Sequence, residues 1–332
     1  RNRILFRAIH QISFMFSSFI GGLFLKKNSV VIATTPQFFC SFSALLISKI
    51  KRIPFILEVA DIWTNSIKAT IKTNSIFFSF LLKIEEYIFK KSDAIIVLTE
   101  GFKKELINRG ISEDKIFIIQ NGVNKPILSR HHKIDLRKEL NLTDEIIIGY
   151  AGSLGLAQGI ENICNTAEIL ESRKNKKIKF VFIGNGDNKD LLIDKSKLFK
   201  NLIYLGNKDR KIIPNYLTEF DIGLAHLIND EAFKTTIPSK IFEFMASGLP
   251  ILMVSPKGDA SEIIEKFDIG KWVNAGDAIL LANTIEEIVS NLEKLKYFSQ
   301  NSIKASLNFS RENQAKKVIE VVEKVISSKI KK

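Results

Sequence analysis

The sequence predicts an α/β protein built from two doubly wound halves, each around a parallel sheet. Short apolar, β-branched runs alternate with segments of helical pattern along almost the whole chain, which is typical of parallel strands joined by helical crossovers. The 332 residues match two domains at roughly 100–200 residues each. A polar, turn-rich stretch interrupts the alternation at 121–141 and is the best candidate linker.

The first half contains four predicted strands with helices between them. The apolar runs that predict strands are 30–35, 54–60, 94–98 and 116–120, and the helical patterns are 39–50, 76–91 and 100–109. We expect these elements to form an N-terminal domain of residues 1–125.

The second half repeats the alternation. Strands are expected at 146–150, 179–183, 202–205, 221–227 and 250–254, and helices at 159–174, 191–199, 212–219, 239–247, 278–295 and 312–330. We expect a C-terminal domain of residues 126–310, a final helix over 311–332, and a cleft between the two domains. In such sheets ligands bind beyond the carboxyl ends of the strands, so the polar segments there are the candidate site.

The apolar segment 4–25 has three interpretations. Arg7, His10 and Gln11 interrupt it and leave only 12–25 without a charge, which is short for a membrane span of about 20 residues. An amphipathic helix packed on the domain is favoured, followed by a helix lying in a membrane interface. The chain opens at Arg1, shows no signal-peptide pattern, and is expected to lack the start of its first domain.

The net charge of +13 is unevenly distributed. Residues 1–126 hold 18 Lys+Arg against 9 Asp+Glu, and the remainder holds 31 against 27. A basic surface suits nucleic acid, an anionic membrane or an anionic substrate, but no nucleic-acid-binding module is recognisable. Cys40 and Cys164 are too few and too isolated for a disulfide scaffold or a cysteine zinc site, and they fit a reducing compartment.

Several strings, in order, resemble the retaining enzymes of glycosyltransferase family 4, whose two Rossmann-like domains form the GT-B fold. The strings are Glu58-Val-Ala-Asp-Ile-Trp63, Ile119-Gln-Asn-Gly-Val-Asn124, Gly149-Tyr-Ala-Gly-Ser-Leu-Gly-Leu-Ala-Gln-Gly159 and Pro238-Ser-Lys-Ile-Phe-Glu-Phe-Met-Ala-Ser-Gly-Leu-Pro250. The first string and the stretch 87–100 are similar to the branch that builds bacterial surface polysaccharides, including N-acetyl-fucosaminyl transferases.

The resemblance implies a donor site in the second half. Glu243 matches the Glu that holds the nucleotide ribose, with an exposed Glu in an i,i+4 pair as the structural alternative. Ser239, Lys240 and Ile241 open the helix expected to bind the diphosphate, unless Ser239 is only an N-cap and Lys240 is solvated. The remaining donor-binding candidates are Gly152, Ser153, Gly155, Gln158, Gly184, Asn207 and Lys208.

The first half supplies the expected acceptor side. Asp61 follows a predicted strand and is a candidate to bind an acceptor hydroxyl or to take its proton. Trp63 and Asn65 are acceptor-binding candidates, Trp63 by stacking on a sugar face. The structural alternative is a capping Asp61 and a core Trp63. Together with Lys240, Asp61 completes the expected catalytic set, and His226 is expected to be a pocket-wall or core residue.

The chain departs from the family pattern at the diphosphate. Ser153 and Gln158 stand where the donor loop usually carries Arg and Lys, and Thr235 replaces the first Glu of the family's E-x7-E pair. No counterpart of the His that many members carry in the first half is present. Lys240 is therefore the first candidate for neutralising the leaving diphosphate, with Arg210 and Lys234 as others. No Asp-x-Asp pair is present to hold a metal, and neither a metal nor a cofactor is expected.

These observations predict a metal-independent, retaining glycosyltransferase. It would transfer a sugar from a nucleotide diphosphate donor, UDP being favoured over GDP, to a lipid-linked saccharide of a bacterial surface polysaccharide. The basic first half would face the anionic inner surface of the plasma membrane, with the enzyme peripheral and cytoplasmic. The alternative is a non-catalytic GT-B-like subunit or an inactive fragment.

Overall fold

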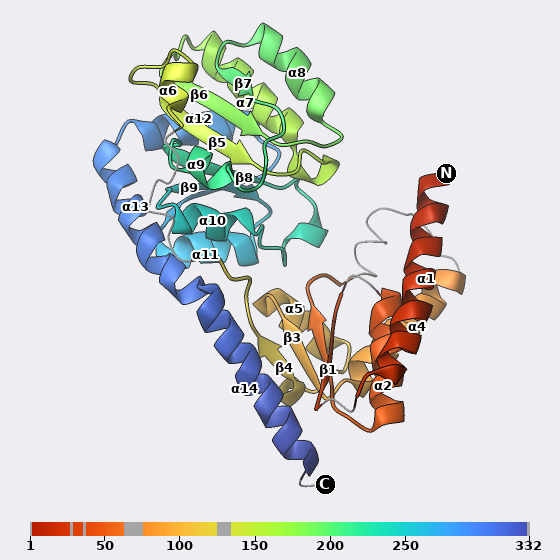
Figure 1. Cartoon of the computed structure of the whole chain (residues 1–332). Coiled ribbons are helices and arrows are strands. Elements are labelled where there is room, and N and C mark those ends of the chain that lie inside the picture. The colour runs from red at the N-terminus through yellow and green to blue at the C-terminus, as the bar shows by residue number, and fades with distance from the viewer. Residues whose placement is uncertain (1, 27–28, 36–37, 63–75, 125–133, 331–332) are drawn as a thin grey trace. The chain divides into compact units, whose positions relative to one another are not determined.

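The computed structural model describes residues 2–26, 29–35, 38–62, 76–124 and 134–330 (Figure 1). Trp63 and Asn65 lie outside the described residues. The chain forms two compact units, Arg1–Gln120 with Gln314–Lys332, and Asn121–Asn313.

The first unit contains a parallel sheet of strand order β1-β2-β3-β4. Its strands lie where the apolar runs predict them, and the expected helix at 76–91 has those same bounds. The elements are β1 (Val31–Thr34), β2 (Phe55–Val59), β3 (Ala94–Val97), β4 (Ile116–Ile118), α1 (Asn2–Phe24), α2 (Phe38–Lys51), α4 (Ile76–Lys91) and α5 (Glu100–Asn108).

The two faces of this sheet are covered by helices from opposite ends of the sequence. Alternate residues of a strand point to opposite faces, so Phe55 and Leu57 pack with α2, α4 and α5. Ile56 faces the other way and packs with Val321 and Val325 of α14 (Arg311–Ile330). The final helix is thus part of the first unit's core.

Helix α1 packs along α2. Ser43 Oγ donates a hydrogen bond of 2.8 Å to the Met15 carbonyl, and Gly22 lies against Ile47, which a Cβ would approach to 2.4 Å. Outside this contact α1 leaves Phe16 and Phe24 exposed. Among the described residues, no helix has both the length and the apolar character needed to span a membrane.

The second unit contains a parallel sheet of strand order β10-β9-β8-β5-β6-β7. Its strands are β5 (Ile146–Ala151), β6 (Ile178–Ile183), β7 (Leu202–Tyr204), β8 (Ile222–His226), β9 (Ile251–Ser255) and β10 (Gly270–Asn274). Its helices are α6 (Leu136–Glu139), α7 (Ile160–Ser172), α8 (Lys189–Leu198), α9 (Ile213–Leu217), α10 (Lys240–Ala246), α11 (Asp259–Phe267), α12 (Ala278–Val289) and α13 (Leu292–Ser306).

Three features of this unit were not expected from the pattern. The pair α11 and β10 was not anticipated, because β10 is a partly buried edge strand with only two large apolar residues, Trp272 and Val273. The polar stretch near 121–141 contains the short helix α6, whose Leu136 is fully buried. The single helix expected over 278–295 is divided, because Asn291 caps a new helix by accepting from the Lys294 N–H.

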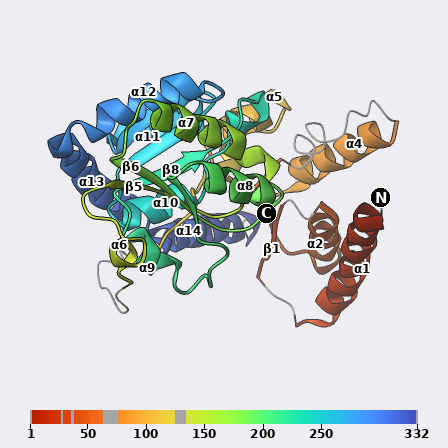
Figure 2. The ribbon, with the colours of Figure 1, turned by 90° about the horizontal axis from the view of Figure 1, so that it is seen from above.

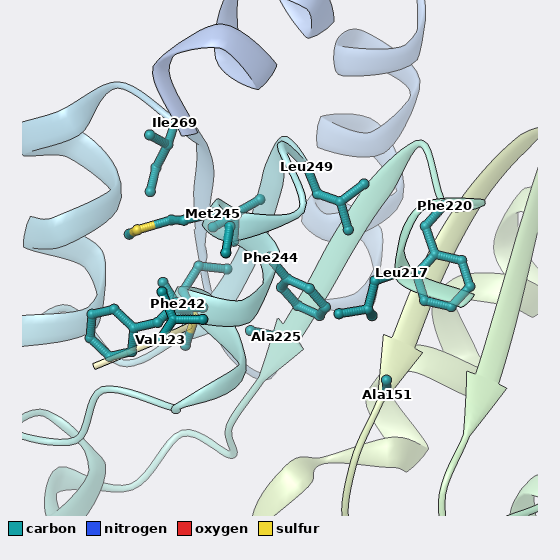
Figure 3. Packing of buried hydrophobic residues seen from close by; sticks show 14 of the residues in the cluster. Val123, Ala151, Leu217, Phe220, Ala225, Phe242, Phe244, Met245, Leu249 and Ile269 are labelled. Carbon is teal, nitrogen blue, oxygen red and sulfur yellow. The ribbon is translucent and has the colours of Figure 1, made fainter. Parts of the chain in front are cut away.

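The second sheet is covered on both faces, as Figure 2 shows for α7 and α12 against α10. Close packing on the α10 side depends on two strand glycines. A Cβ at Gly223 would lie 2.6 Å from the Phe244 ring, and one at Gly149 would lie 1.9 Å from the Phe220 ring. Both rings therefore lie directly on the sheet (Figure 3), and Phe244 holds α10 against β8.

Truncating Phe244 should destabilise the second unit strongly. Phe244→Ala removes a fully buried ring and leaves a cavity beside Gly223, which costs about 3–5 kcal/mol in the free energy of unfolding. Urea denaturation followed by circular dichroism measures this difference. Ile319→Ala, at a residue of α14 that is 55% exposed, is the control and should change stability by less than about 0.5 kcal/mol. Equal effects of the two variants would contradict the packing described here.

Candidate functional site

Backbone hydrogen bonds join the loops that follow the strands of the second sheet. The Gly152 N–H donates to the Ile183 carbonyl at 2.9 Å, and the Gly184 N–H donates to the Gly206 carbonyl at 3.0 Å. The loop after β5 is also tied to the chain beyond β8, because the Ile228 N–H donates to the Ala157 carbonyl at 3.0 Å. The loops expected to bind a ligand are therefore one connected surface at the carboxyl edge of the sheet.

Glycines at two of these loops are required by backbone contact. Gly184 has φ +151° and Gly152 has φ +144°, values that L side chains rarely adopt. A Cβ at Gly184 would lie 1.8 Å from the Gly152 carbonyl oxygen. Gly184 is buried and serves this loop packing, whereas Gly152 is exposed and borders Lys240, whose Nζ would lie 3.2 Å from a Cβ there.

Lys240 carries a buried ammonium group at this edge. Its Nζ lies 3.4 Å from the centroid of the Tyr150 ring, a close cation–π contact. The Tyr150 hydroxyl points elsewhere and donates to the Ser153 carbonyl at 2.6 Å. Although the Lys240 residue is partly exposed as a whole, its Nζ is buried and forms no hydrogen bond with any residue that the structure describes.

A charged Lys240 ammonium is energetically unfavourable in these surroundings unless an anion binds beside it. Burial lowers the pKa of Lys240 to about 7, and the charge of Glu243 opposes that shift. Burial likewise raises the pKa of Tyr150, so the phenol stays neutral. A buried donor that lacks an acceptor is costly, and a diphosphate would supply acceptors together with negative charge.

His226 ends β8 and is 2% exposed. Its Nε2 lies 3.0 Å from Nδ2 of Asn162 on α7. Burial, with a smaller contribution from Lys240, lowers the pKa of His226 to about 3, so the ring is neutral at physiological pH. The prediction of a core or pocket-wall histidine agrees with this burial.

Glu243 lies on an otherwise buried helix. Its neighbours Phe242 and Phe244 are in the core, whereas Glu243 itself is exposed, so burial gives no reason to require a partner for it. Ser239 is exposed and makes no side-chain cap. Ile241 has its side chain in the core, and its N–H donates to the Pro238 carbonyl at 3.0 Å.

The other donor-side candidates border the same loops. Ser153 and Asn207 are exposed, and Gly155, Gln158 and Lys208 are half-buried. The Lys208 Nζ lies 5.6 Å from the centroid of the Tyr216 ring. Of the two other expected cations, Lys234 pairs with Glu231 at 2.8 Å, and Arg210 is exposed.

Asp61 belongs to the first unit, whereas Lys240 belongs to the second. Thr35 Oγ1 donates to the Asp61 carbonyl at 2.7 Å and accepts from the Asp61 N–H at 3.3 Å. These bonds fix the backbone of Asp61 just after β2, where the residue is half-buried. Within the described ranges, no three His, Cys, Asp or Glu side chains are grouped to hold a metal ion.

Sequence reasoning missed two partners in this site. Tyr150 stands in the quoted glycine-rich string, but only the fold shows that its ring lies under the Lys240 ammonium. Asn162 carried no signal, because a polar residue in the first turn of a helix is common.

Two family models cover most of the chain. Residues 132–305 match the model "Glycosyl transferases group 1", and residues 5–125 match "Glycosyltransferase Family 4".

Curated relatives are glycosyltransferases by name. The chain is 27% identical to the probable glycosyltransferase WbjE of Pseudomonas aeruginosa, covering 87% of this chain and 73% of WbjE. It is 25% identical to the putative teichuronic acid biosynthesis glycosyltransferase TuaH of Bacillus subtilis, covering 59% of this chain and 49% of TuaH. The chain thus spans about half to three quarters of the length of these relatives.

Among solved structures, the chain is similar to Anabaena Alr3699/HepE in complex with UDP. The TM-score is 0.74 at 16% identity, over 95% of this chain and 82% of that one. The two parallel-sheet units and this likeness identify the fold as GT-B, as the sequence predicts.

Replacing the Lys240 ammonium should stabilise the protein in the absence of ligand. Lys240→Met keeps the stem and removes the buried donor, which should raise the free energy of unfolding by about 1–3 kcal/mol at pH 6. The folded-state pKa of about 7 lies below the ordinary 10.5, so the penalty is complete below pH 7 and disappears as pH rises toward 10.5. Urea titrations at pH 6 and pH 9 should show the larger gain at pH 6. A destabilised variant at both pH values would contradict the burial of an unpaired charge.

Proposed function

Because the chain belongs to the group 1 glycosyl transferases, we propose that it transfers a sugar, with retention, from a UDP-sugar to a lipid-linked saccharide of a bacterial surface polysaccharide. The names of its relatives place them in polysaccharide biosynthesis or among glycosyltransferases. HepE, which shares the fold, binds UDP, and this favours UDP over GDP here. N-acetylhexosaminyl or other hexosyl transfer is the proposed subtype.

The buried ammonium of Lys240 carries this proposal. It lies beneath Gly152, without a hydrogen bond to the described part of the chain, at the edge of the sheet where ligands of such folds bind. In the proposed complex it contacts the donor diphosphate. Ser153 and Gln158, which replace basic residues of the family pattern, carry no charge, so Lys240 is the proposed source of positive charge.

The chemistry requires stabilisation of a departing diphosphate. The bond from the sugar C1 to the β-phosphate oxygen breaks, a bond from the acceptor oxygen to C1 forms, and the acceptor hydroxyl loses its proton to a base, for which Asp61 is the candidate. Negative charge grows on the leaving phosphate, where a prepositioned ammonium in a dry site is most effective. Attack from the face that the diphosphate leaves would retain the configuration at C1. Metal independence is part of the proposal, and transfer should persist with EDTA.

Glu243 is the proposed ribose ligand. Its exposed carboxylate lies three residues beyond Lys240 on α10, and a carboxylate can accept hydrogen bonds from both vicinal hydroxyls of a ribose. Its charge opposes the lowering of the Lys240 pKa, and a spacing of three residues places the two side chains on the same face of α10. Ser239, Gly155, Asn207 and Lys208 are the proposed further contacts of the donor.

Asp61 is the proposed acceptor-side residue. It would bind the acceptor hydroxyl or take its proton, with Trp63 and Asn65 as proposed acceptor contacts. Residues 1–126 contain 18 basic and 9 acidic residues. A lipid-linked acceptor fits this charge, because an anionic membrane attracts a basic domain. Peripheral association with the cytoplasmic face of the membrane is the proposed location.

A transfer assay with Glu243→Ala tests the donor assignment. Purified protein is incubated with UDP-sugars or GDP-sugars and a lipid-diphosphate saccharide, with EDTA in parallel. We expect transfer from a UDP-sugar and at least about a tenfold lower kcat/KM for Glu243→Ala, since two hydrogen bonds to the ribose are lost. Glu262→Ala, at another acidic helix residue, is the matched control and should keep full activity.

Two outcomes would contradict this proposal. Unchanged transfer by Glu243→Ala would remove the ribose assignment. A folded wild-type protein that binds neither UDP nor GDP by calorimetry would favour the alternative of a non-catalytic GT-B-like subunit.

The exposed apolar residues of α1 predict membrane binding. Phe16 is 57% and Phe24 87% exposed, and burying both rings in lipid would release several kcal/mol. Sedimentation with phosphatidylglycerol vesicles should retain the wild-type protein, and Phe16→Ser with Phe24→Ser should reduce the bound fraction at least about fivefold. Ile319→Ser on α14 is the control. Equal binding by all three proteins would contradict the role of α1.

A further inference from the structure

The ring of His226 lies directly against the turn that ends the glycine-rich loop. Gly159 has φ +53°, and a Cβ on it would lie 2.4 Å from Cε1 and 2.6 Å from Nδ1 of His226. No side chain larger than hydrogen fits between this turn and the ring. The turn is also the start of α7, because the Asn162 N–H donates to the Gly159 carbonyl at 3.1 Å.

The contact with Asn162 fixes the orientation and protonation of the ring. With Nδ2 of the amide facing Nε2 at 3.0 Å, the amide donates and Nε2 accepts, so the proton of the neutral ring resides on Nδ1. Nδ1 is buried and makes no hydrogen bond within the described chain. An unsatisfied buried donor is unfavourable, so its retention beside the loop calls for a functional reason.

A second contact ties the same loop to the chain just beyond His226. The Ile228 N–H donates to the Ala157 carbonyl, so the loop is held by the segment that follows β8 on one side and by the His226 ring on the other. The charge of Lys240 contributes, after burial, to the lowering of the His226 pKa. The ring therefore contacts one end of the loop at Gly159, while the other end of the same loop, at Gly152, borders the Lys240 ammonium.

We propose that His226 is a positioning residue of the donor site, a neutral ring that holds the Gly152–Gly159 loop in the form that receives the diphosphate and keeps water from Lys240. This inference rests on the proposed function. It assigns His226 no contact with the reacting atoms. The ring acts through the loop backbone and through the dehydration of the ammonium.

Binding of UDP and of uridine separates this role from a general loss of stability. His226→Ala should weaken UDP binding at least about tenfold, because the loop no longer meets the diphosphate in one geometry. Uridine, which has no phosphate, should lose less than about twofold. His226→Gln, which keeps a polar group near Asn162, should recover part of the UDP affinity. Ser302→Ala removes a buried hydrogen bond to the Leu249 carbonyl and is the stability control, with no expected change for either ligand.

A double-mutant cycle with Gly159→Ala tests the ring–turn contact itself. Gly159→Ala alone should weaken UDP binding, since its Cβ collides with the ring. Combined with His226→Ala the collision is absent and only the strain of an alanine at φ +53° remains, so the double variant should lose less UDP affinity than the sum of the two single losses. Additive losses would overturn the proposed contact. If His226→Ala fails to fold, the loss of UDP affinity in Gly159→Ala alone, which leaves His226 unchanged, still tests the contact.

The pH profile of UDP binding supplies a readout that a purely structural residue would not change. The titratable groups that act on this region are Lys240, Glu243, Tyr150 and His226 itself. Water admitted by His226→Ala should raise the pKa of Lys240 and move the alkaline loss of UDP affinity upward by about one pH unit. An unchanged profile with unchanged UDP affinity would overturn the inference while leaving the glycosyltransferase proposal intact. If folded wild-type protein binds no UDP, both fail.

Discussion

The proposed donor site depends on one electrostatic arrangement, the Lys240 ammonium held over the Tyr150 ring without a hydrogen-bonding partner in the described chain. The contact with the ring recovers part of the lost hydration but supplies no acceptor. The close packing of α10 and the glycines that bring loop backbones together make this position possible. A stable fold that retains such a group carries an unfavourable charge that an anionic ligand would satisfy.

The rigid backbone around Lys240 holds its ammonium in a fixed position. The Phe244 ring of α10 packs directly on Gly223 of β8. The absence of a side chain at Gly184 lets the loop after β6 pack on the carbonyl of Gly152. The carboxyl edge of the second sheet is therefore formed by backbone groups with little freedom to move. Preorganisation of this kind lets a single cation stabilise a departing phosphate without reorganising at the moment of reaction. It also explains how uncharged Ser153 and Gln158 could be tolerated in the donor loop.

The fold was largely predictable because buried parallel strands are continuous apolar runs. The edge strand β10 was not predicted because it has no continuous apolar run, and the contribution of α14 to the first unit's core has no local signature in the sequence. The segments proposed to bind the donor were named from motif strings, and Lys240 is among them. The unpaired state of its ammonium, its contact with Tyr150 and the neutral His226 beneath Gly159 arise from contacts between distant residues, which a single sequence does not reveal.

Calorimetry of UDP binding at pH 8.5 tests directly whether Lys240 contacts the diphosphate. Above its folded-state pKa of about 7 the Lys240 amine is mostly neutral, and a diphosphate would restore its charge. Titrations in two buffers of different ionisation enthalpy should show an uptake of about one proton per UDP by the wild-type protein. Lys240→Met should bind UDP at least about tenfold more weakly and take up almost none. Full UDP affinity in Lys240→Met, or binding of UDP by the wild type without proton uptake, would show that Lys240 does not bind the diphosphate.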